Sequence, residues 1–110
     1  MRLLSKYMTA SGQVSNGRCR LHSAIFLNKK DSSSAEYFDF HDGTTSSGTP
    51  ILCRVYPNTD DTGSADWYGP NSSLDIPSEG ILFDTGIYLH STMASGEGCV
   101  TLIFSGGAPA

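Results

Sequence analysis

The 110-residue chain carries a formal net charge of −4 at pH 7, with 38% hydrophobic residues, 16% charged residues and 12 glycines. So few charges exclude a coiled coil and an acidic disordered tail, and seven dispersed basic residues in an acidic chain argue against nucleic-acid binding. A second hydrophobic core would leave each half too small to fold unaided. We therefore expect residues 1–110 to form one compact, soluble, all-β domain.

The N-terminal segment shows no targeting signal. Lys6 interrupts its apolar residues after two leucines, whereas a secretory signal needs an apolar run of about 7–15 residues. No run approaches the roughly 18 apolar residues of a membrane-spanning helix. These observations predict synthesis in the cytoplasm and no membrane partner. Residues 1–8 are predicted to form either an arm that reaches a neighbouring molecule or an edge strand of the domain.

Apolar and polar residues alternate along most of the chain, and turn residues interrupt them about every 8–12 positions. Turns at residues 11–12 and 15–17 separate an extended segment, Arg2–Met8, from the longest candidate strand, Cys19–Leu27. Successive side chains of a strand point to opposite faces, so this strand would place its odd-numbered residues, Ile25 included, on one face. The opposite face would hold Arg20, His22 and Phe26.

The middle of the chain predicts two further strands around a polar turn. Residues 35–41 would direct Phe38 and Phe40 inward, and Asp39 and His41 outward. A long polar turn and another strand follow, at residues 42–48 and 51–56.

The last third of the chain predicts short strands joined by tight turns. A strand at residues 73–76 leads into Pro77–Gly80, where Pro fixes φ near −65° in a tight turn. Residues 84–86 are predicted to form a three-residue hairpin loop between strands at 81–83 and 87–89.

The final strand, residues 99–104, is apolar on both faces, which predicts a central place in the sheet or at a subunit contact. Residues 105–110 are expected to form a C-terminal tail. The pattern as a whole predicts seven or eight short antiparallel strands and no helix. Burial of their hydrophobic faces favours a single β-sandwich of jelly-roll-like topology, with an immunoglobulin-like sandwich as the alternative.

The metal-ligating residue types do not form a complete motif. The chain has three cysteines, expected to be reduced, buried thiols: Cys19, Cys53 and Cys99. Cys19 and His22 have C-x-x-H spacing, but no second ligand pair follows at zinc-site spacing. Residues 58–63 match the first half of a calcium loop, and Gly69 then stands where the bidentate Glu should be. We predict no metal and no cofactor.

The residues of acid–base catalysis are equally incomplete. His22, His41 and His90 lie on three different predicted strands. Asp42 follows His41 directly, but adjacent residues of a strand point to opposite faces, so the two side chains should not meet. No nucleophile turn of the G-x-S-x-G type is present. The sequence therefore predicts structural histidines and a protein that is not an enzyme.

Aromatic residues leave one binding activity open. Trp67, Tyr68, Tyr56 and Tyr88 could stack on sugar rings, and β-sandwiches host many carbohydrate-binding modules. Because Trp67 and Tyr68 are adjacent, we expect one of them in the core and the other at the surface or an interface.

Four segments follow one another along the chain: residues 17–22 (GRCRLH), 73–83 (SLDIPSEGILF), 86–89 (GIYL) and 100–104 (VTLIF). Together they resemble a group of small virion proteins of tailed bacteriophages. In that group a "GxCRL" strand opens the domain, an "IPxxGIxF…GLY" hairpin follows and a "VTVxY"-like strand ends the chain. The resemblance covers residues 17–104, and this chain departs from it at residues 57–66 and after the last strand.

The resemblance implies a non-enzymatic role as a capsid decoration (cement) protein, or as a small head or tail appendage of the virion. The implied partners are the major capsid protein or another virion protein, and a homo-oligomer, with a trimer favoured. The residues predicted to contact a partner are the apolar and basic residues of the N-terminal segment and the adjacent aromatic pair: Arg2, Leu3, Leu4, Tyr7, Trp67 and Tyr68. A carbohydrate-binding appendage is the alternative function.

Overall fold

A computed structural model describes residues 2–28, 37–56, 72–77, 79–92 and 98–110. Eight strands and no helix are present in these ranges. They are β1 (Leu4–Met8), β2 (Gly12–Asn28), β3 (Phe38–Asp42), β4 (Ile51–Val55), β5 (Ser72–Asp75), β6 (Ile81–Phe83), β7 (Gly86–Ser91) and β8 (Gly98–Pro109). Each pairing is antiparallel, and the predicted all-β, sandwich-like fold is confirmed. Two strands are long, however: β2 has 17 residues and β8 has 12.

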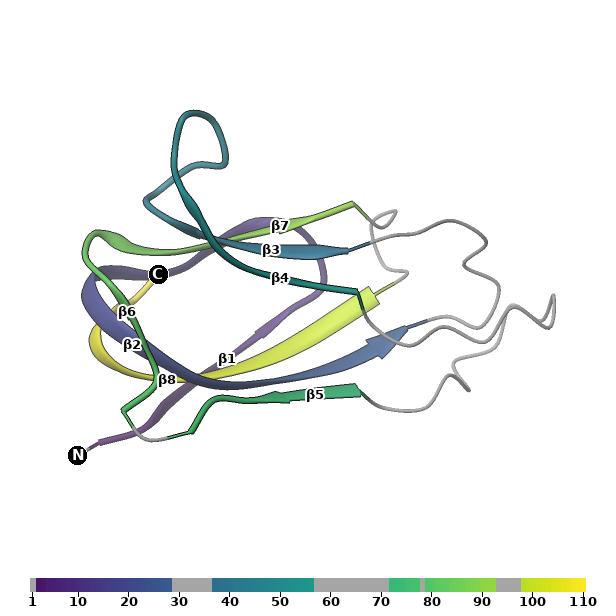
Figure 1. Ribbon diagram of the computed structural model, residues 1–110, viewed down its shortest axis with the longest axis horizontal. Coiled ribbons are helices and arrows are strands. Elements are labelled where there is room, and N and C mark those ends of the chain that lie inside the picture. Colours follow the sequence, from purple (N-terminus) through teal and green to yellow (C-terminus); the bar gives the residue numbers. More distant parts are fainter. Residues whose placement is uncertain (1, 29–36, 57–71, 78, 93–97) are drawn as a thin grey trace, which may run out of the picture.

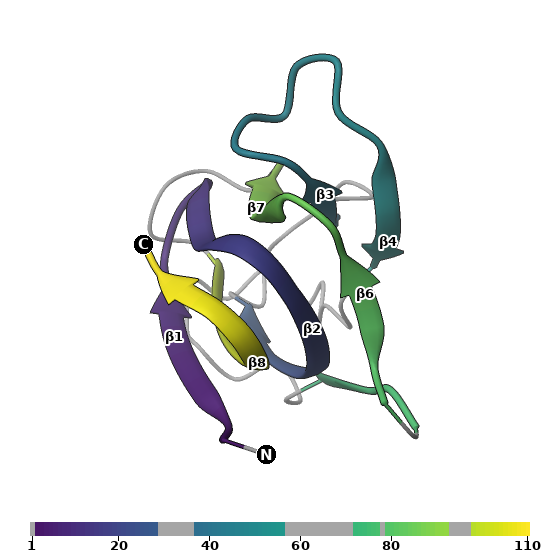
Figure 2. The same cartoon turned by 90° about the vertical axis from the view of Figure 1, so that its left-hand side faces the viewer.

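The strands form one continuous sheet in the order β1-β8-β2-β7-β3-β4, and β5 and β6 also pair with β2. The sheet folds over on itself, so that β7, β3 and β4 lie above β1, β8 and β5 (Figure 1). The long β2 connects the two layers by curling around one end of the molecule, accompanied by β8 (Figure 2). The hydrophobic core lies between the layers.

Irregular pairing along β2 changes which of its side chains face the core. A bulge between Leu21 and Ser23 interrupts the pairing with β8. An extra residue reverses the alternation of faces, so Leu21 and Phe26 are both fully buried whereas Ile25 is 45% exposed. The predictions that Ile25 shares a face with Leu21, and that Phe26 lies on the opposite face, were therefore wrong.

The turn predicted at residues 15–17 is also wrong, because these residues lie inside β2. The pairing with β8 shifts between Asn16 and Cys19, and Gly17 adopts a φ of 82° there. A strand with a bulge can bend without ending, so the glycine that suggested a turn instead lets β2 pass from one layer to the other.

The segment at residues 84–86 does not close a hairpin. β6 pairs with Cys19–Leu21 of β2, and β7 pairs with residues 12–16 of the same strand. β6 and β7 therefore do not pair with each other but with two successive parts of β2. The turn between them carries the chain from one of these parts to the next.

The predicted tail is likewise part of the sheet. β8 continues to Pro109, which is opposite Ser15, and the Ala110 N–H donates to the Val14 carbonyl at 3.2 Å. Because β8 lies between β1 and β2, its predicted central position is confirmed.

The core is rich in phenylalanine. The Phe26 ring contacts Phe38 and Phe40, with centroid separations of 5.1 and 6.4 Å. The complete set of buried hydrophobic residues is Val14, Cys19, Leu21, Ala24, Phe26, Phe38, Phe40, Phe83, Ile87, Leu89, Val100, Leu102 and Phe104. The inward prediction for Phe38 and Phe40 is confirmed.

The cysteines differ in burial. Cys19 is buried, whereas Cys53 and Cys99 are only half-buried, which corrects the expectation of three buried thiols. Burial is the main factor that raises the thiol pKa of both Cys19 and Cys53. These two thiols are therefore held in the neutral, weakly nucleophilic form at pH 7.

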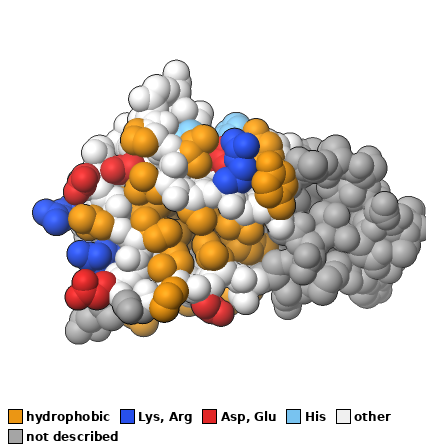
Figure 3. Space-filling view, viewed as in Figure 1, with side chains coloured by type: hydrophobic (Ala, Val, Ile, Leu, Met, Phe, Trp, Pro, Cys, Tyr) orange, Lys and Arg blue, Asp and Glu red, His pale blue; other side chains and the backbone are white. Residues whose placement is uncertain are grey.

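β4 ends the strand order and, in the described ranges, does not pair with β5 or β6, both of which pair with β2. Partly buried hydrophobic residues of β4 and of the β5–β6 region pack against the core: Cys53, Val55, Leu74, Ile76 and Ile81. Hydrophobic side chains accordingly gather in the middle of the face seen in Figure 3. No helix in the described ranges is long and apolar enough to cross a membrane.

Candidate functional site

The N-terminal residues that were predicted to contact a partner lie at one edge of the sheet. Residues Leu4–Met8 form the edge strand β1, which pairs with β8. Of the arm and the edge strand expected for residues 1–8, the structure thus contains the edge strand. Leu3 is 55% and Tyr7 63% exposed, whereas Leu4 packs against the core. Arg2 is exposed as well. Trp67 and Tyr68 lie outside the described residues.

Tyr7 belongs to an apolar row across three strands. Thr101 of β8 lies between Tyr7 of β1 and Ile25 of β2, because it pairs with both residues. Ile103 lies in the next row of the same face, between Ser5 and Ser23. We call this surface the β1–β8–β2 outer face, made by Leu3, Tyr7, Ile25, Thr101 and Ile103.

The Tyr7 side chain lies close to that of Cys99 on β8. A hydrogen bond with the Cys99 side chain is the main cause of the raised pKa of Tyr7.

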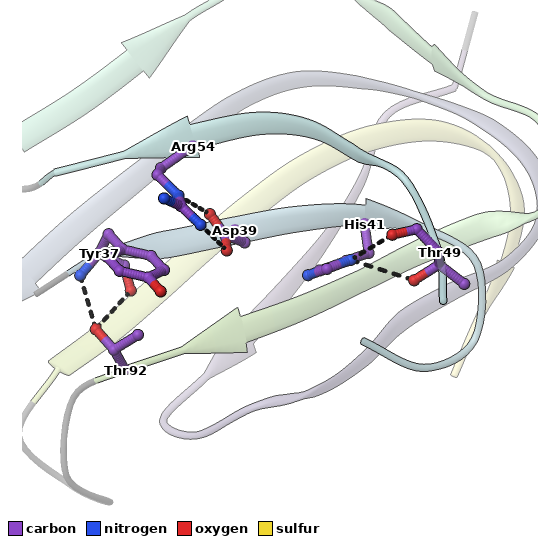
Figure 4. Close-up of polar contacts among 6 residues, drawn as sticks. All are labelled: Tyr37, Asp39, His41, Thr49, Arg54 and Thr92. Atoms are coloured by element: carbon purple, nitrogen blue, oxygen red, sulfur yellow. Dashed lines mark hydrogen bonds and ion pairs between the residues drawn. The ribbon is translucent and has the colours of Figure 1, made fainter. Parts of the chain in front are cut away.

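A second surface combines charge and aromatic rings on the other layer. The Arg54 guanidinium donates to both carboxylate oxygens of Asp39, at 2.6 and 2.9 Å, and lies 3.9 Å from the centre of the Tyr37 ring (Figure 4). The Tyr56 ring meets Tyr37 edge-on, with 5.6 Å between centroids. The hydrogen bonds that Arg54 donates to Asp39 are the main cause of the raised pKa of Arg54.

Histidines extend this surface along β3 and β7. The His41 ring lies 6.3 Å from that of His90 and 6.5 Å from that of Tyr88. His41 Nδ1 is 3.2 Å from the Thr49 carbonyl oxygen, and a carbonyl only accepts, so Nδ1 carries the proton (Figure 4). We call the surface formed by these rings and ions the β4–β3–β7 outer face.

The outward orientation predicted for Asp39 and His41 does not leave them exposed. They are only 2% and 5% accessible, because residues of β4 and of the turn before it cover them. Strand alternation correctly separates their side of β3 from the phenylalanine side. Alternation alone could not show that Asp39 has Arg54 of β4 opposite it on one side and His90 of β7 on the other.

The remaining catalytic and metal candidates are separated or engaged elsewhere. His22 Nε2 is 2.7 Å from Ser105 Oγ, and Cys19 Sγ is 3.0 Å from Ser15 Oγ. In the ranges that the structure describes, no group of three or more His, Cys, Asp or Glu side chains could hold a metal ion. The calcium-like segment at residues 58–69 lies outside those ranges.

Asp42 has a structural role. Its two carboxylate oxygens accept the backbone N–H groups of Asp84 and Thr85, at 3.2 and 2.8 Å. The carboxylate therefore fixes the turn between β6 and β7, and does not act on His41.

In comparisons with known proteins, no family model and no curated protein matches the chain.

Proposed function

We propose that this chain is a non-enzymatic structural protein of a tailed-bacteriophage virion, which decorates the capsid and stabilises the shell by bridging neighbouring subunits. The resemblance that suggests this role lies in the framework of the fold. Its segments fall on β2, on β5 and β6, on β7 and on β8, and they include Leu21, Phe83, Leu89 and Phe104 of the core. The segments that carry the resemblance thus contribute residues to the core of the sandwich.

The β1–β8–β2 outer face supports the proposal, and it is the observation that carries it. Leu3, Tyr7 and Ile25 are three of the six large hydrophobic side chains exposed in the described ranges. The strand register places Tyr7 and Ile25 on this face, and alternation assigns Leu3, two residues before Ser5, to the same side. A stable contact of about 800 Å² per partner needs such an apolar centre with a polar rim. The proposed partner is the major capsid protein, and self-association, as a trimer, would bury a second part of the surface.

A particle-binding experiment tests the role and the face together. The gene is deleted from the phage that carries it, and purified protein is added back to the mutant particles. We expect the wild type to cosediment with particles and to raise their melting temperature. The double substitution Leu3→Ser and Tyr7→Ser should lower occupancy about tenfold or more, because two exposed anchors of the contact are lost.

The matched control is Leu52→Ser with Tyr56→Ser. It removes the same pair of residue types from the β4–β3–β7 outer face, where they are 38% and 57% exposed. This variant should bind particles like the wild type. Absence of the protein from wild-type virions would refute the proposed role, and equal loss of binding in both double variants would refute the assignment of the face.

A carbohydrate-binding appendage is the second candidate, and the β4–β3–β7 outer face favours it. Exposed Tyr56 beside Tyr37 offers a ring for stacking, and Arg54 and His90 offer polar contacts nearby. On a glycan array the two double variants should then behave in the opposite way: Leu52→Ser/Tyr56→Ser abolishes binding and Leu3→Ser/Tyr7→Ser retains it. If the wild type binds no glycan, this candidate is eliminated.

A further inference from the structure

A small hollow lies where the bend of β2 meets β6 and β8. Its volume is about 190 Å³, and its lining is Arg18, Cys19, Arg20, Leu82, Ser105 and Gly106. We propose that this hollow is a receptor for a single carboxylate, presented by an acidic side chain of a partner protein. The inference concerns the ligand chemistry of this site and holds whether or not the partner is a virion protein.

Backbone features that only glycine tolerates build the hollow. The shift in pairing between Asn16 and Cys19 brings Arg18 and Arg20 to the border of one cavity. Gly106 and Gly107 of β8 have φ angles of 77° and 67°, which other residues rarely adopt. A Cβ at Gly107 would lie 2.6 Å from the Asn16 carbonyl oxygen, so β8 could not approach the bulge this closely with any side chain there.

Arg18 and Arg20 form no ion pair within the described part of the chain, whereas Arg54 is paired with Asp39. After burial, the charge of Asp42 also contributes to the raised pKa of the Cys19 thiol, and the Asp42 oxygens accept the N–H groups of Asp84 and Thr85. Two arginines thus border one hollow in an acidic protein. Its chemistry is that of an oxyanion site, since guanidinium groups match the two oxygens of a carboxylate.

The other lining residues are compatible with a bound carboxylate. Ser105 is a buried residue whose hydroxyl lies 2.7 Å from His22 Nε2. Leu82 adds an apolar side chain to the lining, and the Cys19 thiol is buried and neutral, so it does not repel an anion.

Size and net charge narrow the class of ligand. A volume of about 190 Å³ admits the carboxylate end of an Asp or Glu side chain and is too small for a nucleotide. The net charge of −4 also opposes the approach of a polyanion. An acidic side chain on a protein surface is small enough for this volume and carries a single negative charge. The residues around it can make further contacts with this protein.

An NMR titration of the full-length, ¹⁵N-labelled protein tests the proposal. The probe is the α-amide of N-acetylglutamate, whose only charge is the side-chain carboxylate, and the neutral comparison is the α-amide of N-acetylglutamine. We expect saturable shifts of the Arg18, Arg20, Ser105 and Gly106 amide signals with the charged probe and none with the neutral one. Arg18→Gln and Arg20→Gln should each weaken binding about tenfold or more, because each removes a charge-assisted hydrogen bond.

Two further samples separate this site from a general charge effect. Lys6→Gln removes one positive charge elsewhere, from a side chain that contacts the Ala110 carbonyl oxygen, and should titrate like the wild type. Retained dispersion of the amide spectrum shows that each variant is folded. Equal shifts with both probes, unchanged affinity in both arginine variants, or tighter binding of inorganic phosphate than of the carboxylate would overturn the proposal.

Discussion

Phe26→Ala is expected to lower the free energy of unfolding by about 3–5 kcal/mol, the range for deletion of a buried aromatic ring. The Phe26 side chain has no exposed surface, and its ring contacts both Phe38 and Phe40. Truncation to Ala therefore leaves a cavity between the two layers of the sandwich. A domain of this size has about 5–15 kcal/mol of stability, so the variant should unfold at a much lower urea concentration.

The matched control is Ile25→Ala, one residue earlier on β2. Ile25 is 45% exposed on the outer face, so its truncation should cost less than about 1 kcal/mol. Urea unfolding followed by far-UV circular dichroism compares the two variants. If the simple alternation of faces held through β2, the order of the two effects would be reversed, and such a result would contradict the bulge between Leu21 and Ser23.

Gly80→Ala is expected to destabilise the fold by about 2–5 kcal/mol. Gly80 has a φ of 81°, and a Cβ there would lie 2.5 Å from the Leu21 carbonyl oxygen. The left-handed conformation costs a non-glycine residue about 1–2 kcal/mol, and displacement of the backbone adds about 1–3 kcal/mol. The clash is with the middle of β2, where Leu21 pairs with Ile81, so β6 would have to move away from β2.

Gly48→Ala separates the conformational cost of a left-handed residue from the cost of displacing the backbone. Its φ of 74° is close to that of Gly80, but nothing lies within 4 Å of the position that its Cβ would take. It should therefore show only the conformational cost of about 1–2 kcal/mol. Thermal and urea unfolding measure both variants, and equal losses at the two positions would show that contact with β2 is not what requires glycine at residue 80.

Local features of the chain were sufficient to predict the elements. Phe38 and Phe40 alternate with more polar neighbours, and both are buried as expected. The Pro77–Gly80 turn was likewise predicted, and the Gly80 N–H donates to the Pro77 carbonyl at 3.4 Å. Such features depend on side-chain period and on the φ preferences of Pro and Gly, which act within a few residues.

The candidate surfaces were only partly predictable. Leu3 and Tyr7 could be assigned to an exposed N-terminal segment from the interleaved basic residues around them. The pairing of Asp39 with Arg54, and the shared hollow of Arg18 and Arg20, depend on strand register between distant segments. No short-range pattern marks these residues, because each is an ordinary polar position of its own strand.

By itself, the amino-acid sequence determined that this protein is built of strands, where most of them begin and end, and which side of β3 is apolar. Only the tertiary structure decided that β2 bends through bulges, that β6 and β7 are both its partners, and that the last residues of the chain extend β8. The reason is physical: alternation is a local property of a strand. A bulge or a register is chosen by the competition of several distant strands for the same backbone hydrogen bonds and the same core.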